Sequence, residues 1–266
     1  MNKIQRLKKI LKKLGSIVVA FSGGVDSSFL LRVASDTLPK KDILAVTAVS
    51  DTYTRSELRQ ARDFAKRLNV RHKIIRTNEL SDINFAKNPR DRCYYCKKEL
   101  FGRLKGIARE NAARFVVDAS NLDDKKDYRP GSIAKKEFMV RSPLQEARIT
   151  KVDIRRYSKR LGLETWNAPS MACLASRIPY GRRIEKTLLK KVERAENVIK
   201  RLGIKQVRVR YHEGIARIEV EQKDIKRFLN KRFCDRIKKS LKLIGFTYIV
   251  LDLEGYRTGS LNEALR

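Results

Sequence analysis

The sequence Ser22-Gly23-Gly24-Val25-Asp26-Ser27-Ser28 decides the fold of this chain. An apolar run, residues 17–21, precedes it, and an apolar, helix-like run, residues 29–33, follows it. A buried strand, a glycine turn and a helix start form an anion-binding site in this order. Glycine lets the backbone approach a phosphate, hydroxyls donate to it, and the unpaired N–H groups of the helix start face it. A Gly-Gly turn with a helix cap would also use these residues, but the agreement of strand, loop and helix favours nucleotide binding. The Walker pattern is absent, so this is not an ordinary P-loop.

The composition is strongly basic. The chain has 266 residues, with 62 Lys and Arg against 30 Asp and Glu, a net charge of +32. Such a charge attracts polyanions such as RNA, or phosphorylated small molecules. The basic residues are spread along the whole chain, which also fits an organism whose proteins are generally rich in lysine. Charge alone therefore does not identify the substrate.

No apolar run approaches the roughly 18 residues that span a bilayer. Basic residues precede a short apolar run at residues 3–21, as in a signal peptide, but this run leads directly into the glycine loop. We therefore expect a cytoplasmic protein without a membrane partner, whose cysteines serve metal or catalytic chemistry rather than disulfides.

Strand and helix patterns alternate through the first half of the chain. This alternation predicts an α/β fold with a parallel sheet covered on both faces. Its ligand crevice should lie at the carboxyl ends of the strands, where the loops at 22–28, 50–54 and 120–131 fall. Thr150 and Asp153 resemble a capping box that opens a helix. Beyond residue 166, two paired strands and helices, one of them spanning 228–244, predict a smaller α+β domain. We expect domains at 1–168 and 169–266.

Four cysteines are present, and two of them form the pair Cys93-Tyr94-Tyr95-Cys96. Taken alone, this pair fits a redox couple or half of a zinc site, which would be incomplete without further ligands. Cys173 lies far away in the sequence. Cys234 shares a helical face with apolar residues, so we expect it in the core.

The glycine loop resembles that of the PP-loop ATP pyrophosphatases, which cleave ATP between its α- and β-phosphates to adenylate a substrate. Further stretches resemble one subfamily, the LarE sulfurtransferases of nickel-pincer cofactor biosynthesis. The matching stretches extend from residue 16 to 262, and Cys173-Leu-Ala-Ser-Arg177 is the most specific. They lie at residues 91–100, 141–144, 171–181, 207–210, 216–220 and 252–262.

The resemblance implies ATP-dependent conversion of a pyridinium carboxylate mononucleotide to a thiocarboxylate. ATP and Mg²⁺ would bind at the loop, with Asp26 and Cys173 as catalytic residues. The implied ATP-binding residues are Ser22, Gly23, Gly24, Asp26, Ser27 and Ser28. The implied residues for the phosphate of the substrate are Ser176, Arg177, Arg208 and Arg210. By pattern alone, arginines alternating along a strand more often face solvent, so this assignment depends on the resemblance.

Two routes for sulfur occur in the family. In one branch a single cysteine gives up its own sulfur and becomes dehydroalanine. In the other, three cysteines hold a [4Fe–4S] cluster whose fourth iron carries an extra sulfide. This chain has the three-cysteine pattern, Cys93, Cys96 and Cys173, which favours the cluster and an external sulfide or sulfur donor.

Two other functions fit parts of the sequence. A [4Fe–4S]-dependent tRNA thiolase of the same superfamily would suit the net charge, and RNA therefore stays open as a partner. However, such enzymes commonly carry zinc modules or an RNA-binding appendage, and neither is recognisable here. A regulator that only binds nucleotide would not need the Cys173–Arg177 motif. The family commonly forms higher oligomers, so we also expect a homo-oligomer.

Overall fold

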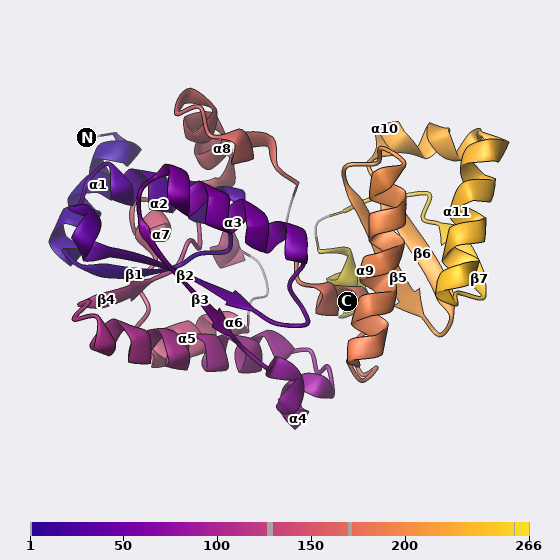
Figure 1. The fold of residues 1–266 in the computed structure, drawn as a ribbon, viewed down its shortest axis with the longest axis horizontal. Helices are drawn as coiled ribbons and strands as arrows, with labels where there is room; N and C mark the ends of the chain where they lie inside the picture. The colour runs from indigo at the N-terminus through magenta and orange to yellow at the C-terminus, as the bar shows by residue number, and fades with distance from the viewer. Residues whose placement is uncertain (1, 127–129, 170–171, 258, 266) are drawn as a thin grey trace. The chain divides into compact units, whose positions relative to one another are not determined.

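The computed structural model describes residues 2–126, 130–169, 172–257 and 259–265, and the chain divides into two compact units (Figure 1). The N-terminal unit holds Met1–Phe85 and Asp91–Met171, and the C-terminal unit holds Ala86–Arg90 and Ala172–Arg266. Among the described residues, none of the helices combines the length and apolar character that crossing a membrane requires.

A parallel four-stranded sheet forms the centre of the N-terminal unit, as the alternation of patterns predicts. The strand order is β3-β2-β1-β4, and every neighbouring pair is parallel. The strands are β1 (Ile17–Ala20), β2 (Ile43–Val49), β3 (Arg71–Arg76) and β4 (Phe115–Val117). The short bridge from Val117 to Arg141 extends the pairing beyond β4. The α/β fold class is confirmed.

Helices cover both faces of this sheet (Figure 1). They are α1 (Lys3–Leu14), α2 (Val25–Ser35), α3 (Arg55–Arg67), α5 (Arg92–Glu110), α6 (Gly131–Glu137), α7 (Pro143–Glu146) and α8 (Lys151–Arg160). The short helix α4 (Ile83–Ala86) follows β3 and is not part of either cover. Ile17 and Val19 of β1 face α1, α2, α3 and α8, whereas Val18 faces α5 and α6. Both faces of β1 are buried, and this explains why its residues are apolar on both faces.

Among the described residues, capping boxes start three helices, α1, α3 and α8. Thr150 Oγ1 accepts from the backbone N–H of Asp153, whose carboxylate accepts from the N–H of Thr150 in return. This confirms the predicted start of α8. The expected loop at 120–131 includes residues 127–129, which lie outside the described residues.

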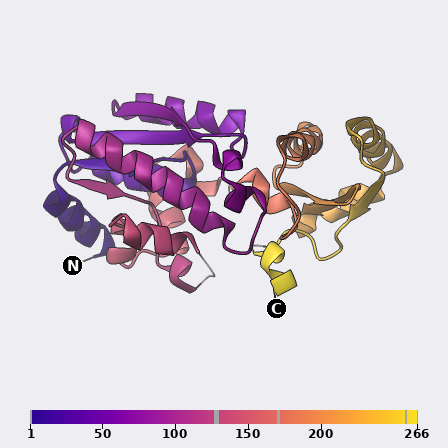
Figure 2. The ribbon, with the colours of Figure 1, turned by 90° about the horizontal axis from the view of Figure 1, so that it is seen from below.

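The C-terminal unit contains a mixed three-stranded sheet of order β5-β6-β7. Its strands are β5 (Val207–His212), β6 (Ile215–Val220) and β7 (Tyr248–Leu251), and its helices are α9 (Lys186–Arg201), α10 (Gln222–Ile225) and α11 (Lys231–Ile244). β5 and β6 pair with each other, as expected, and their direction is antiparallel, while β7 adds a parallel neighbour to β6. Figure 2 shows α9 and α11 on one side of these strands and the C-terminal segment on the other.

The helix expected over 228–244 is interrupted. A 3₁₀ turn, Lys226–Leu229, ends before Asn230, and α11 begins at Lys231. The Asn230 side chain accepts a hydrogen bond from the N–H of Phe233 at 3.0 Å, and this cap fixes the start of the new helix.

Candidate active site

The glycine loop connects β1 to α2 at the carboxyl edge of the parallel sheet. Gly23 has a φ of +75°, and a Cβ there would lie 3.1 Å from the Cβ of Ala61 on α3. Only glycine combines this backbone conformation with such close packing. Gly24 is the N-cap of α2, and its carbonyl accepts from the Ser27 hydroxyl at 3.1 Å. The loop is therefore held against α3, and the N–H groups that start α2 follow it directly.

Two buried oxygens at the start of α2 have no hydrogen-bond partner among the described residues. They are Oδ1 of Asp26 and Oγ of Ser28. A buried polar atom without a hydrogen-bond partner lowers the stability of the fold, and such atoms commonly bind a ligand or an ion. A carboxylate oxygen is a ligand that Mg²⁺ prefers, and a hydroxyl donates to phosphate. The residues present therefore fit Mg²⁺ and a nucleotide phosphate.

The loop after β2 contacts the glycine loop, as the sheet topology predicts. The Tyr53 hydroxyl donates to the carbonyl oxygen of Ser22 at 2.5 Å. Burial raises the pKa of Tyr53, and the nearby charge of Glu57 raises it further, so the phenol stays a donor. Sequence analysis did not identify Tyr53, because nothing local connects it to a residue 31 positions earlier.

A lysine that the sequence analysis missed also lies at this site. Lys151, the first residue of α8, places its Nζ 2.6 Å from Oδ2 of Asp26. The capping-box pattern locates Lys151 at a helix start, but no sequence signal places this helix beside α2. The ammonium group of Lys151 therefore lies at the loop, with its charge balanced by the Asp26 carboxylate.

The backbone of Lys151 is held from several sides. Its N–H donates to the Asp123 carboxylate at 2.8 Å, and the capping box surrounds it. Burial alone would raise the pKa of Asp153, but hydrogen bonds from Lys3 and Thr150 outweigh burial and lower this pKa to about 2. Asp153 is thus a charged anchor at the start of α8.

We expect Asp153→Asn to lower the free energy of unfolding by about 1–2 kcal/mol at neutral pH. The folded pKa of about 2 lies below the ordinary value of 3.8. The stabilisation is therefore fully present above about pH 4 and is lost as the pH falls towards 2. Urea unfolding of both proteins from pH 7 to pH 3 measures it, with Asp63→Asn on the exposed face of α3 as the control. A difference that does not shrink towards pH 3 would contradict this account.

The predicted cysteines lie in both units. Cys93 and Cys96 are in the first turns of α5 in the N-terminal unit, three positions apart and therefore on one helix face. Cys173 belongs to the C-terminal unit, where it is the exposed N-cap of a 3₁₀ turn, Leu174–Arg177. Cys234 is half-buried on α11, and its Sγ donates to the carbonyl of Phe228 at 2.8 Å.

The predicted substrate-phosphate residues come together in the C-terminal unit. Arg208 and Arg210 are each 6% exposed on β5, so they do not face solvent as the alternating pattern alone suggests. The Arg210 guanidinium donates to both carboxylate oxygens of Glu219 on β6, at 2.5 and 3.0 Å. Its Nη1 donates to the carbonyl of Ser176 at 2.6 Å, which ties the Cys173–Arg177 turn to β5.

Arg177 is also buried and makes a two-pronged ion pair with Glu196 of α9, at 2.7 and 3.1 Å. Burial opposes the ionisation of Glu196, but the charges of Arg177 and Arg208 outweigh it and lower the pKa of Glu196. Burial lowers the pKa of Arg208, and the charge of Arg177 lowers it further. Arg208 also lies 5.5 Å from the ring centre of Tyr256.

This network of Arg177, Arg208, Arg210, Glu196 and Glu219 carries three positive and two negative charges. The excess positive charge is buried, where it interacts more strongly with an anion than it would in water. Sequence analysis identified the arginines but not the two glutamates, whose partners are set by strand pairing and by the packing of α9.

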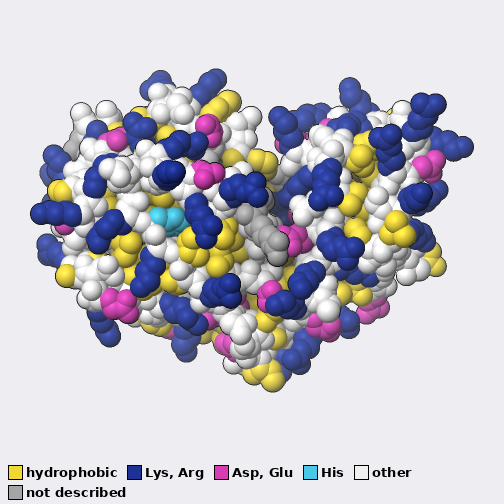
Figure 3. Space-filling model, viewed as in Figure 1, with side chains coloured by type: hydrophobic (Ala, Val, Ile, Leu, Met, Phe, Trp, Pro, Cys, Tyr) yellow, Lys and Arg dark blue, Asp and Glu magenta, His cyan; other side chains and the backbone are white. Residues whose placement is uncertain are grey.

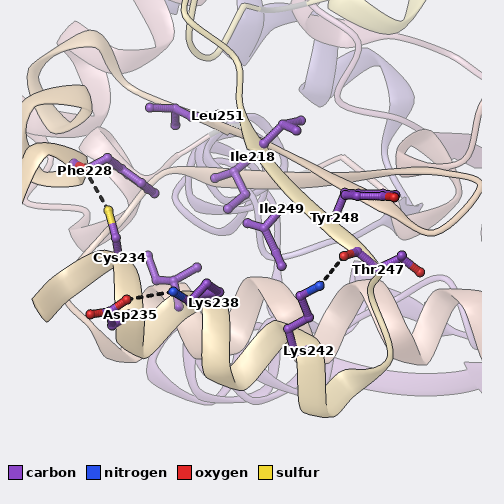
Figure 4. A pocket seen from close by; sticks show the side chains of 12 residues that line it. Ile218, Phe228, Cys234, Asp235, Lys238, Lys242, Thr247, Tyr248, Ile249 and Leu251 are labelled. Atoms are coloured by element: carbon purple, nitrogen blue, oxygen red, sulfur yellow. Dashed lines mark hydrogen bonds and ion pairs between the residues drawn. The ribbon is translucent and has the colours of Figure 1, made fainter. Parts of the chain in front are cut away.

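The C-terminal unit also contains a groove of about 370 Å³ between α11 and β7 (Figure 4). Apolar side chains such as Ile218 and Ile249 line it, and Lys238 and Lys242 lie at its edge (Figure 4). None of the predicted site residues lines this groove. Basic side chains are scattered over the visible face of the molecule and do not gather in one patch (Figure 3).

The strand, the positive-φ glycine and the helix start define the nucleotide-binding domain of a PP-loop ATP pyrophosphatase. A family model described as queuosine biosynthesis protein QueC matches residues 16–90, the part that contains this loop. Three relatives match almost the whole chain. The pyridinium-3,5-bisthiocarboxylic acid mononucleotide synthase of Lactiplantibacillus plantarum is 39% identical over 96% of this chain and 92% of its own.

An uncharacterised protein of Synechocystis is 40% identical over 99% of this chain and 98% of its own. Another uncharacterised protein, from Methanocaldococcus jannaschii, is 32% identical over 97% of this chain and 98% of its own. The chain belongs to the LarE family of PP-loop ATP pyrophosphatases. It is therefore an enzyme, an ATP-dependent synthase of the sulfur-inserting LarE type.

Proposed function

We propose that this enzyme adenylates a pyridinium carboxylate mononucleotide and converts it to a thiocarboxylate for nickel-pincer cofactor biosynthesis. The observation that carries this proposal is the 39% identity, over nearly the full length, to a pyridinium-3,5-bisthiocarboxylic acid mononucleotide synthase. The glycine loop and the buried arginine network support it, because the reaction needs a nucleotide site and a site for the phosphate of the substrate.

We assign the ATP chemistry to residues 1–168. A carboxylate oxygen of the substrate bonds to the α-phosphorus, the bond from that phosphorus to the bridging oxygen breaks, and its electron pair leaves with pyrophosphate. The loop residues Ser22, Gly23, Gly24, Ser27 and Ser28 bind the phosphates through N–H and hydroxyl groups. Asp26 holds Mg²⁺, which when bound neutralises charge on the phosphates.

We assign substrate binding and sulfur transfer to residues 169–266. Ser176, Arg177, Arg208 and Arg210 bind the phosphate of the mononucleotide. The excess positive charge of the arginine network supports this assignment, since charge-assisted hydrogen bonds to phosphate are strong. Glu196 and Glu219 hold Arg177 and Arg210 in fixed orientations.

Cys173 is the residue at which sulfur reaches the activated carboxyl group. We propose that Cys93, Cys96 and Cys173 together ligate a [4Fe–4S] cluster, since thiolates are the ligands that such clusters take. When bound, the cluster would supply an open iron site that carries sulfide. The sulfur displaces AMP from the acyl adenylate and leaves the thiocarboxylate. The alternative is a sacrificial Cys173, which loses its own sulfur and becomes dehydroalanine.

The test is a complete reaction with the mononucleotide, MgATP and sulfide. We expect AMP, pyrophosphate and a product in which one oxygen is replaced by sulfur, detected by mass spectrometry. The matching nucleoside without the phosphate should show a KM higher by about 10- to 100-fold, because it loses the charge-assisted contacts. In Arg208→Met this difference between the two substrates should shrink.

Bulk tRNA is the competing substrate, because the net charge of +32 also suits RNA. We expect it to bind weakly and with a steep salt dependence. ATP-dependent appearance of a thiolated base in tRNA, with no reaction of the mononucleotide, would contradict the proposed function and favour a tRNA thiolase.

A further inference from the structure

The sheet of the C-terminal unit has one protected edge and one open edge. At the outer edge of β5, the backbone N–H of Val209 donates to the buried carboxylate of Glu196 at 3.1 Å. β7 forms the opposite edge, and all 4 of its residues are apolar or aromatic. Proteins commonly protect an edge strand with a charge, a proline or a covering element, and an apolar edge without these devices accepts another strand.

The backbone of β7 has hydrogen-bonding groups that its own sheet does not use. The N–H groups of Tyr248 and Asp252 donate towards β6, to the carbonyl oxygens of Gly214 and Ile218 at 3.3 and 2.9 Å. Successive peptide groups of a strand point in opposite directions, so the N–H groups of Ile249 and Leu251 point away from β6. The described residues provide no acceptor for these two N–H groups. A strand beside β7 would find them already aligned.

The apolar groove described above follows this edge. All the residues of β7 line it, together with residues of α11 and the ring of Phe228 (Figure 4). Every second side chain of an added strand would face α11 and enter this groove. On the other face of β7, Tyr248 and Val250 are 65% and 42% exposed, so the next side chains of that strand would also meet an apolar surface.

Helix α11, which forms the wall of the groove, is strongly basic. Six of its 14 residues are Lys or Arg, and only Asp235 is acidic. Asp235 pairs with Lys238 at 2.9 Å, whereas Lys242 donates to the carbonyl oxygen of Thr247 and has no carboxylate partner among the described residues (Figure 4). This wall therefore attracts acidic side chains and repels another basic helix.

We propose that β7 and this groove bind an extended, acidic segment of a partner protein, which adds a strand to the C-terminal sheet. The main chain of the segment pairs with Ile249 and Leu251, its apolar side chains fill the groove, and its acidic side chains lie beside Lys238 and Lys242. A second copy of the chain fits less well, because each copy carries a net charge of +32 and brings its own basic α11 to the contact. RNA is acidic too, but its sugar-phosphate backbone cannot form the hydrogen-bond ladder that a strand edge offers.

The test is fluorescence anisotropy of the full-length protein with the labelled peptide Glu-Val-Glu-Ile-Glu-Val. This peptide should bind at least about 10-fold more tightly than the same residues in the order Val-Ile-Val-Glu-Glu-Glu, because only alternation fits a strand. The double variant Lys238→Glu, Lys242→Glu should weaken binding by about 10-fold or more. The matched control is Arg232→Glu, Lys239→Glu, which makes the same charge change on α11 outside the groove and should weaken binding much less. Circular dichroism of each variant checks the fold.

Amide hydrogen exchange, measured by NMR, tests the geometry of the contact. The amides of Ile249 and Leu251 should exchange about 10-fold more slowly or less when the peptide is bound, since they gain acceptors. Equal binding of both peptides, or binding without this protection, would overturn strand addition. Protection of the two amides in the protein alone, lost on dilution, would assign the edge to a second copy. A short oligouridine that binds through Lys238 and Lys242, with no binding of the alternating peptide, would assign it to RNA.

Discussion

Cys173→Ala should reduce thiocarboxylate formation by about 10³-fold or more while pyrophosphate release continues. In either sulfur route the thiol of Cys173 is needed, whereas adenylation depends on the glycine loop. The backbone of this residue is held by Ser176 and Arg177, whose side chains donate to its carbonyl at 2.9 and 3.0 Å. The exposed thiol itself is available for chemistry, so the substitution should not disturb the fold. Pyrophosphate and product are measured in the same reaction.

The matched control is Cys234→Ala, which should keep both steps, because Cys234 packs on α11 away from the predicted site. Loss of pyrophosphate release in Cys173→Ala would contradict the separation of the two steps. Anaerobic reconstitution of the wild type with iron and sulfide should give about four irons per chain. Cys93→Ala and Cys96→Ala should lose iron and sulfur transfer together. An iron-free protein that turns over once and becomes lighter by the mass of H₂S would instead establish the sacrificial route.

The second large effect is expected for Asp26→Ala, which should lower the rate of adenylation, measured as pyrophosphate release, by about 10²–10³-fold. The substitution removes the carboxylate proposed to hold Mg²⁺ and leaves the ammonium of Lys151 without its partner. Because the pair is partly exposed, its loss should cost at most about 1 kcal/mol of stability. Pyrophosphate release is followed against Mg²⁺ concentration, and thermal unfolding checks the fold.

Asp36→Asn provides the control for Asp26→Ala, because Asp36 caps the other end of α2 and pairs with Arg32 at 2.8 Å. It should release pyrophosphate like the wild type. If Asp26→Ala does so as well, Asp26 has no part in nucleotide chemistry, and the unpartnered Oδ1 needs another explanation.

Features that depend on neighbouring residues could be predicted from the sequence. The Ser22–Ser28 loop and the capping box at Thr150 are set by short-range geometry. The break before α11 also had a local signal, because Asn230 is a good N-cap. The apolar periodicity on both sides of Asn230 nevertheless suggested one continuous helix. The parallel sheet followed from the alternation of strands and helices, because only crossover connections produce that pattern.

Other features required the tertiary structure. The sequence by itself determined a nucleotide loop at the edge of a parallel sheet, and it indicated arginines on one face of β5. Only the fold decided that Lys151 reaches Asp26, 125 positions away. It also decided that the buried Arg210 and Arg177 form ion pairs with Glu219 and Glu196. The physical reason is that a local pattern fixes backbone geometry and the direction of a side chain. Its partner, its burial and its charge environment depend on which distant element packs against it.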